Sequence, residues 1–382
     1  MPTLAATKDV SFFYTDSGAP PSATYTTIVL IHGHTWHSGA HTSSLLYTFT
    51  NNAPAVFDRL LPLARTRNLR LICVNRRLYP GSTPYTPEEA AQIASPDPSG
   101  VLAAQGVLLA LFIARLPAAL RLPRPQHGRA GGIALAGWSL GTLFVQLVLS
   151  ALDAVDEATR TILRAYVQRV ILWDAPSPFF GIVPPYDYNP FTDERAPPEA
   201  RLDLFLRWVS GYYTHNPVTR ELSYESPDAD IKPSVERMPD LLALTEPSAS
   251  EGGDTALINP DLIPLMGHIT EDALLNPPLH RRWGGLKIHC ITGSRSVWNI
   301  VLAAWRVADM AKVAGVRVDV KMVPGANHFV MWDDPENAIR ALHECCGVSK
   351  VQKTHNRFRS ASRTVVQLKY PWRRSRMSVD IV

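Results

Sequence analysis

Short apolar runs alternate along this chain with longer stretches in which apolar residues recur every three or four positions. The short runs are rich in β-branched residues and have strand length, whereas the longer stretches have the period of amphipathic helices. Buried strands separated by helices are typical of a parallel sheet covered on both faces. The pattern therefore predicts an α/β fold with a mostly parallel central sheet and helices on both faces. The expected strands are 10–16, 26–31, 69–75, 133–136, 169–173, 286–292 and 316–323, and the expected helices are 57–64, 98–116, 142–149, 297–314 and 335–345.

This alternation stops after the fifth expected strand, where prolines become dense and strand-like runs disappear. Short helical patterns remain there, at 201–213 and 235–244. The alternation of strands and helices resumes with the sixth expected strand, so the intervening region is predicted to be an insertion. We expect a core of residues 1–177 and 284–346, interrupted by a mainly helical, proline-rich cap of residues 178–283.

Three further segments depart from the pattern. Residues 39–55 fit neither a strand nor a helix and are expected to be an insertion at the mouth of the site, and residues 246–254 are expected to form a loop. The tail, 347–382, lacks apolar periodicity and carries nine Lys and Arg and one acidic residue, a net charge of +8. We expect this tail to be disordered. The rest of the chain then has a net charge of −4, so the total of +4 does not indicate nucleic-acid binding.

Composition is ordinary for a globular protein. The 382 residues are 46% hydrophobic and 19% charged, which allows a large core. The N-terminus lacks the apolar core of a signal peptide, and the long apolar stretches 101–122 and 133–152 are expected inside the fold rather than across a membrane. The four cysteines have neither metal-site nor disulfide spacing. We therefore expect a cytoplasmic protein with reduced thiols, without a metal or cofactor, and of unspecified oligomeric state.

The sequence Gly-Trp-Ser-Leu-Gly at 137–141 lies between an expected strand and an expected helix. The pattern G-x-S-x-G at such a junction is a nucleophile elbow, a tight turn that holds its serine in strained geometry. The glycines on either side leave room for that turn. The five residues alone also occur by chance in unrelated chains, but the order of strand and helix favours Ser139 as the nucleophile.

A second signature is His32-Gly33, at the end of the strand 26–31. A glycine at this place lets the backbone turn sharply, and the amides that follow can then point at a ligand. We expect the amides of His34 and Leu140 to stabilise an oxyanion.

A serine nucleophile needs a base within hydrogen-bond reach. Of the twelve histidines, His328 is the one in the loop after the last expected strand, within Gly-Ala-Asn-His-Phe, and a helix follows it. We predict that His328 is the base. The acidic pair Asp333 and Asp334 is expected to start that helix rather than to take part in the site.

Together these motifs resemble those of the α/β-hydrolase family, and the overall character of the sequence is similar to that of fungal members. The residues that carry the resemblance are His32-Gly33, Asn-Arg-Arg-x-Tyr-Pro-Gly-Ser at 75–82, the elbow, and Gly-Ala-Asn-His-Phe followed by Trp332-Asp333-Asp334-Pro335-Glu336. The resemblance implies an α/β-hydrolase fold with an inserted cap and a triad in the order serine, acid, histidine.

The acid of this triad has two candidate positions. The family usually places it after the strand before the last, in a G-x-x-D pattern, but here that loop reads Gly293-Ser294-Arg295-Ser296. Some relatives take the acid from the end of the strand after the elbow helix, where this chain has Asp174. We predict the triad Ser139, Asp174 and His328. The alternative is that Asp174 only caps a loop and that a serine–histidine pair acts alone.

These residues predict an esterase- or lipase-like serine hydrolase that cleaves a small apolar carboxylic ester, lactone or thioester through an acyl-enzyme. Epoxide hydrolysis and dehalogenation are disfavoured because the relatives that perform them use an aspartate nucleophile. Two alternatives remain: an acyltransferase or cyclase with the same triad, and a non-catalytic member that binds a ligand. Some aromatic residues could line the pocket, but such residues more often pack in the core and are not assigned to the site: Trp36, Trp138, Trp208, Tyr212, Tyr213 and Phe329.

Overall fold

A computed structural model describes residues 2–39, 55–126, 130–186, 188–190, 193–224, 227–238 and 253–347. Most of the expected insertion at 39–55, most of the loop at 246–254 and nearly all of the basic tail lie outside these described residues.

The described chain is built on one eight-stranded sheet with the order β1-β2-β4-β3-β5-β6-β7-β8. The pairs β1–β2 and β2–β4 are antiparallel, and the remaining pairs are parallel. The prediction of a mostly parallel sheet is therefore confirmed. The strands are β1 (Thr3–Ala5), β2 (Ser11–Asp16), β3 (Thr26–Ile31), β4 (Leu69–Val74), β5 (Ile133–Trp138), β6 (Val167–Trp173), β7 (Lys287–Gly293) and β8 (Val318–Val323).

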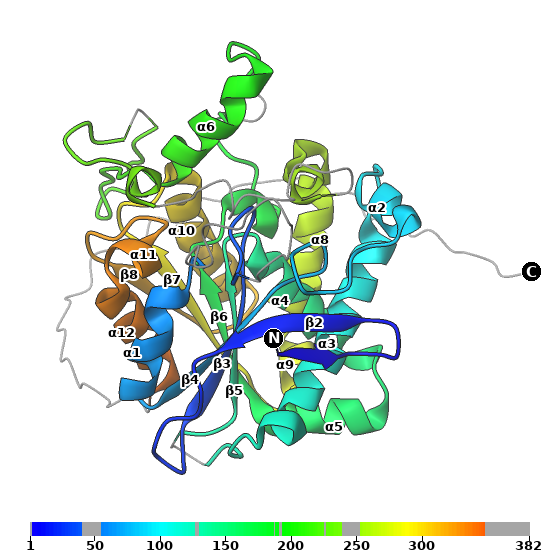
Figure 1. Ribbon diagram of the computed structural model, residues 1–382. Helices are drawn as coiled ribbons and strands as arrows, with labels where there is room; N and C mark the ends of the chain where they lie inside the picture. Colours follow the sequence, from blue (N-terminus) through cyan, green and yellow to red (C-terminus); the bar gives the residue numbers. More distant parts are fainter. Residues whose placement is uncertain are drawn as a thin grey trace, which may run out of the picture. The chain divides into compact units, whose positions relative to one another are not determined.

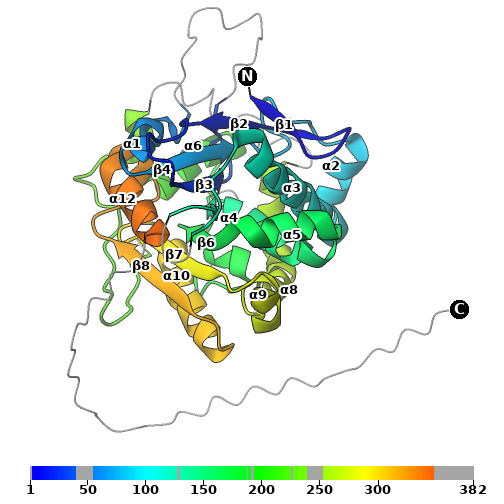
Figure 2. The same ribbon diagram turned by 90° about the horizontal axis from the view of Figure 1, so that it is seen from below.

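Each central strand buries both of its faces, as the unbroken apolar runs predict. In β3, Val29 and Ile31 belong to one hydrophobic core, whereas Ile28 and Leu30 belong to the other. Helices cover the two faces unequally (Figures 1 and 2). One face carries α3 (Ser99–Leu120), α4 (Gly141–Ser150), α5 (Glu157–Tyr166), α8 (Ile263–Ala273), α9 (Pro277–Arg282) and α10 (Trp298–Val313); the other carries α1 (Leu61–Thr66), α11 (Val330–Asp333) and α12 (Pro335–Cys346).

One helix boundary follows from side-chain capping. The helix α2 (Pro87–Ile93) starts with a capping box in which the Thr86 side chain accepts from the Glu89 amide and the Glu89 side chain accepts from the Thr86 amide.

The expected helix 98–116 continues to Leu120, through Pro117, and is followed by Arg121 in a left-handed conformation. This helix is the one in the described chain that is long and apolar enough to cross a membrane, and 61% of its apolar window is buried in the fold.

The region 178–283 holds helices and 3₁₀ turns, and its described part contributes no strand to the sheet. It contains α6 (Pro198–Val209), η4 (Ser234–Arg237), η5 (Asp254–Ile258), η6 (Pro260–Leu262), α8 and α9, and η3 (Ser177–Phe180) leads into it. In Figure 1, α6 stands at the top, beyond the ends of the strands. By contrast, α8 packs against α4, where Thr270 donates a hydrogen bond to Gln146 (2.8 Å). The division of the chain into core and cap therefore stays a prediction.

Candidate active site

Ser139 lies at the sharp turn between β5 and α4. Its φ is +55°, a left-handed conformation that is uncommon for a serine. A Cβ at Gly137 would lie 2.5 Å from the Gly141 carbonyl oxygen, and a Cβ at Gly141 would lie 2.2 Å from that of Ile31. Both positions thus require glycine, as the elbow pattern predicts. The Ser139 amide donates to the carbonyl of Trp173 (2.8 Å), which fixes the turn to the end of β6.

His328 and Asp174 are joined by a buried hydrogen bond. Nδ1 of His328 lies 3.0 Å from Oδ2 of Asp174, and the two side chains are 1% and 0% exposed. The imidazole also stacks on the indole of Trp138, the residue before Ser139, with 4.7 Å between ring centroids. Trp138 in turn donates its Nε1–H to the His328 carbonyl (3.2 Å). Because Nδ1 is engaged by the carboxylate, Nε2 is the ring nitrogen left to exchange a proton with a serine.

The Asp174 carboxylate is held at the end of β6 by two further donors. Gly293 donates its amide to Oδ1, and Ser296 donates its hydroxyl to Oδ2, both at 2.8 Å. Ser296, which stands where the family usually has its acid, is therefore a hydrogen-bond donor to Asp174, the predicted acid. The φ of Asp174 is +52°, so its backbone is strained in the same sense as that of Ser139.

The loop after β3 approaches the elbow closely. A Cβ at Gly33 would lie 2.7 Å from the Cβ of Ser139, so only glycine lets the loop come this close to the elbow. His34 and Ser139 line the same cavity. Leu140 precedes the first residue of α4, where amides lack an acceptor within the helix. The oxyanion roles of the His34 and Leu140 amides stay predictions, with both residues beside the serine.

The side chain of His34, for which the sequence suggested no role, is part of the site. Its Nδ1 lies 2.6 Å from Oγ1 of Thr35, and its Nε2 lies 3.3 Å from Oγ1 of Thr255. Burial lowers the pKa of His34 to about 4, although the charge of Asp254 opposes this effect. The imidazole is therefore neutral at neutral pH.

A buried ion pair lies under the His34 loop and was not found from the sequence. Arg76 donates from Nη1 to Oδ1 of Asp254 (2.8 Å) and from Nη2 to Oδ2 (2.5 Å). Burial raises the pKa of Asp254, but the charge and hydrogen bonds of Arg76 outweigh it, and the net pKa lies below its usual range. Two consecutive arginines directly after a buried strand, Arg76 and Arg77, are the signal that could have pointed to such a pair.

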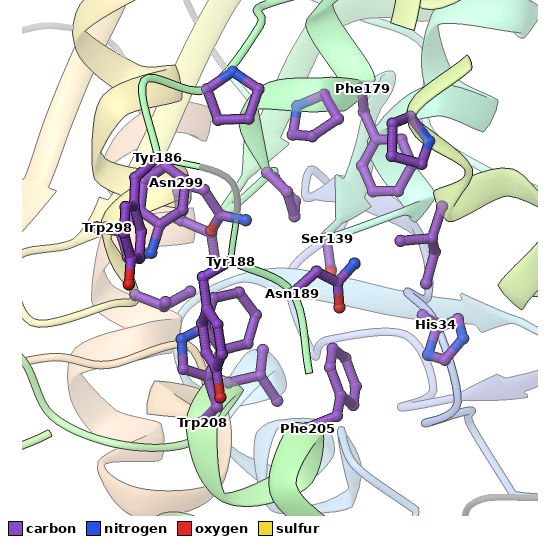
Figure 3. A pocket seen from close by; sticks show the side chains of 18 of the residues that line it. His34, Ser139, Phe179, Tyr186, Tyr188, Asn189, Phe205, Trp208, Trp298 and Asn299 are labelled. Carbon is purple, nitrogen blue, oxygen red and sulfur yellow. The ribbon is translucent and has the colours of Figure 1, made fainter. Parts of the chain in front are cut away.

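A cavity of about 300 Å³ opens over Ser139. Figure 3 shows Ser139 near the middle of the view, with His34 on the right and Tyr186, Trp298 and Asn299 on the left. Of the aromatic residues weighed from the sequence, only Trp208 belongs to the described wall. The other lining residues include Phe179, Val183, Tyr188, Asn189, Phe205, Val209, Ile258, Ile263, Val297 and Ile300. No Asp, Glu, Lys or Arg is among the described residues that line it.

Of the acidic pair after His328, Asp334 starts the following helix as expected, whereas Asp333 is the last residue of α11 and has other partners. Asp334 is the N-cap of α12 and accepts a hydrogen bond from the Asn337 amide (3.1 Å). Asp333 accepts from Tyr212 (2.6 Å) and also from Ser234. Asp333 therefore fastens the end of the His328 loop to residues of the predicted cap.

Comparisons with known proteins agree with this architecture. The esterase EaEST from Exiguobacterium antarcticum has a similar fold, with a TM-score of 0.53, 15% sequence identity, and coverage of 91% of this chain and 99% of that one. Weaker matches include a putative aryl esterase from Burkholderia cenocepacia (TM-score 0.47, 16% identity, 90% and 96% coverage) and a bromoperoxidase from Bacillus anthracis (TM-score 0.48, 12% identity, 90% and 98% coverage). A search of curated protein sequences finds no match.

The decisive comparison is with protein families. The model of the alpha/beta hydrolase family matches residues 28–341, which include the β3 loop, the elbow, Asp174 and His328. This match covers most of the chain, from within β3 to beyond the end of β8. The chain belongs to the alpha/beta hydrolase family.

Proposed function

We propose that this protein is a serine hydrolase that cleaves a carboxylic ester, lactone or thioester of a small uncharged substrate. As Oγ of Ser139 bonds to the carbonyl carbon, Nε2 of His328 takes the hydroxyl proton and the carbonyl π electrons move to oxygen. The amides of His34 and Leu140 stabilise that oxyanion.

The tetrahedral intermediate then collapses to an acyl-enzyme. The bond to the leaving group breaks, and His328 returns the proton to the departing oxygen or sulfur. A water molecule, deprotonated by His328, then attacks the acyl carbon. As the bond to Oγ breaks, His328 returns this proton to Oγ, which releases the acid and restores the Ser139 hydroxyl.

The observation that carries this proposal is the buried hydrogen bond between Nδ1 of His328 and Asp174. The imidazole that forms this bond stacks on Trp138, the residue before Ser139 in the elbow. A carboxylate at Nδ1 stabilises the imidazolium that forms when Nε2 takes a proton. An aspartate that only capped a loop would not need to contact this histidine.

The cavity supports the proposed substrate class. Its described wall is apolar and aromatic with no formal charge, and its volume is at the small end for ligand pockets. Asn299 supplies one polar side chain in that wall. We infer a small, neutral acyl group that bears a hydroxyl or similar uncharged polar group. The cytoplasm stays the proposed compartment, supported by four free cysteines.

A fluorophosphonate probe tests the nucleophile, and a panel of nitrophenyl esters of increasing acyl length, lactones and thioesters tests the substrate class. In the wild type, Oγ of Ser139 should bond to the phosphorus of the probe and displace fluoride, and the enzyme should hydrolyse at least one panel member. Ser139→Ala should retain its circular dichroism spectrum and lose both activities. A folded wild-type protein that neither reacts with the probe nor turns over any ester would contradict the proposal and favour a ligand-binding role.

An acceptor distinguishes hydrolysis from acyl transfer. Repeating the assay with millimolar alcohol or thiol should leave the free acid as the main product if the enzyme is a hydrolase. A transfer or cyclised product that dominates at low acceptor concentration would instead identify an acyltransferase or cyclase.

A further inference from the structure

Asp254 is a buried carboxylate that the triad does not use. It is the first residue of η5, in the predicted cap, and its side chain is 4% exposed. Arg76 lies in the loop after β4, and its side chain is 1% exposed. Its guanidinium donates hydrogen bonds to both carboxylate oxygens of Asp254. The two residues lie 178 positions apart in the chain. The pair therefore joins a cap segment to the core at a place where solvent does not reach.

The same guanidinium holds the loop that carries His34. Arg76 donates from Nη2 to the carbonyl of Gly33 (2.8 Å) and from Nε to that of His32 (3.3 Å). Its own amide donates to Nε2 of His32 (3.1 Å), and its guanidinium lies over the ring of Phe144, in α4, at 4.4 Å. Arg76 thus fixes the two carbonyls that precede the His34 amide, and it also contacts the helix that begins after Ser139.

A second path from Asp254 reaches the following residue of this loop. Tyr79 donates its hydroxyl hydrogen to Oδ2 of Asp254 and accepts the amide hydrogen of Thr35 (3.0 Å). The φ of Thr35 is +72°, which is strongly disfavoured for a β-branched residue. Such a conformation persists only where surrounding contacts enforce it. The phenol supplies one of those contacts, and Asp254 orients the phenol.

We propose that Asp254 is a positioning residue that, through Arg76 and Tyr79, holds the His32–Thr35 loop in the geometry needed to stabilise an oxyanion. This inference rests on the proposed function. The two paths end on either side of His34, whose amide is the predicted donor. The contacts of Asp254 therefore join a segment of the predicted cap to the loop that bears the predicted oxyanion donor.

The adjacent arginine offers a matched control. Arg77 forms an ion pair with Glu89 in α2 (2.5 Å), and their side chains are 3% and 26% exposed. Its other bonds go to the carbonyls of Thr83 and Pro84. The Glu89→Gln variant therefore removes a similar charge pair from the neighbouring residue without touching the His32–Thr35 loop.

The experiment compares wild type, Asp254→Asn, Tyr79→Phe and Glu89→Gln with the best ester from the panel. In Asp254→Asn, kcat should fall by about 10- to 100-fold while KM changes by less than about threefold, because the oxyanion forms only after binding. Tyr79→Phe keeps the ion pair and should shift kcat in the same direction. Glu89→Gln should keep kcat within about threefold of wild type.

Inhibition by a phenylboronic acid supplies a readout that a purely structural role would not move. The boron accepts Oγ of Ser139 and becomes a tetrahedral anion, so its binding reports on the oxyanion site. Its inhibition constant should rise in Asp254→Asn and Tyr79→Phe in proportion to the loss of kcat, which means weaker binding. It should stay unchanged in Glu89→Gln.

Wild-type kcat and boronate affinity in Asp254→Asn and Tyr79→Phe would overturn the inference, and so would an equal loss in Glu89→Gln. If Asp254→Asn does not fold, Tyr79→Phe alone decides between these outcomes. A wild type that turns over no ester refutes the proposed function instead, so the two failures are distinguishable.

Discussion

Ser296 donates its hydroxyl hydrogen to the carboxylate of Asp174 at 2.8 Å, from the loop in which related enzymes usually carry the acid. The same carboxylate oxygen lies 3.0 Å from Nδ1 of His328. The loops after β6 and β7 therefore meet at one point beside the histidine, and a carboxylate from either loop could serve it. In this chain the loop after β6 supplies the charge, and the loop after β7 supplies a donor that stabilises it.

This arrangement predicts unequal effects for the two positions. Asp174→Asn removes the charge that stabilises the imidazolium, and kcat should fall by about 10³- to 10⁴-fold. Ser296→Ala removes one of three donors to Asp174, while Gly293 and His328 still hold the carboxylate. Its kcat should fall by only about 3- to 30-fold. Steady-state hydrolysis of one ester by both variants measures this ranking.

The control for this ranking is the thermal unfolding midpoint of each variant, which shows whether a loss of rate reflects unfolding. A folded Asp174→Asn enzyme with nearly full activity would remove Asp174 from the triad. A Ser296→Ala enzyme as impaired as Asp174→Asn would mean that the hydroxyl, rather than the carboxylate, carries the effect.

The parts of this fold that the sequence predicted depend on local patterns. Val29 and Ile31 face one core while Ile28 and Leu30 face the other, and such a two-sided strand is visible as an unbroken apolar run. The elbow is equally local, since Gly137 and Gly141 are needed for contacts that any G-x-S-x-G turn makes. Short elements with little pattern, such as β1, α2 and α5, were not predicted.

The remaining features depend on contacts between distant segments. The order of the chain made Asp174 a candidate, but only the packing of β6 beside β7 places it against Ser296 and His328. No periodicity relates Arg76 to Asp254, because their pairing requires the cap segment to return to the core across 178 residues. The sequence therefore offered candidates for the reacting groups but not the contacts that position them.

Gly33 should be intolerant of any side chain. In Gly33→Ala the new Cβ would lie 2.7 Å from Cβ of Ser139 and 3.1 Å from the Trp138 carbonyl oxygen, so either the His34 loop or the elbow must shift. Overpacking of this kind typically destabilises by about 1–3 kcal/mol. We expect ester hydrolysis to fall by more than about 100-fold, a larger loss than unfolding alone explains. Urea unfolding and kcat, measured together, separate the two effects.

Gly100 provides the matched control. It lies in the first turn of α3, is exposed, and has no heavy atom within 4 Å of a built Cβ. Gly100→Ala should leave activity unchanged and stabilise the protein by about 0.5–1 kcal/mol, because alanine loses less backbone entropy in a helix. Equal activities for the two alanine variants would show that the approach of Gly33 to Ser139 is unimportant for function.

Asn299 should set a preference for substrates with a hydroxyl remote from the scissile carbonyl. Its side chain is an uncharged polar group in the otherwise largely apolar cavity wall, so a substrate hydroxyl could form a hydrogen bond with its amide. A hydrogen bond of this kind is worth about 1 kcal/mol, or about fivefold in rate. The ratio of kcat/KM for two aryl esters, with and without a hydroxyl at the far end of the acyl group, should favour the hydroxylated ester in wild type and fall about fivefold in Asn299→Leu.

The control is Ile300→Val, which trims a neighbouring apolar residue of the same cavity wall. It should affect both esters alike and leave their ratio unchanged. A hydroxyl preference that persists in Asn299→Leu would assign the recognition to another group.

His34 should make the protein less stable in mild acid. Burial lowers its pKa to about 4 in the folded protein, whereas an unfolded histidine has a pKa of about 6.5. Between these values the unfolded chain binds a proton that the folded chain does not, so stability falls as pH falls from 6.5 towards 4. The loss attributable to His34 between pH 7 and pH 5 is about 2 kcal/mol. Urea unfolding of wild type and His34→Gln at both pH values measures it.

His34→Gln isolates this contribution because glutamine does not titrate. His32 also has a pKa well below its usual value, owing first to burial and then to the charge of Arg76, and it remains in both proteins. Wild type should therefore lose about 2 kcal/mol more than the variant between pH 7 and pH 5. Equal losses would mean that the imidazole of His34 accepts a proton in the folded state.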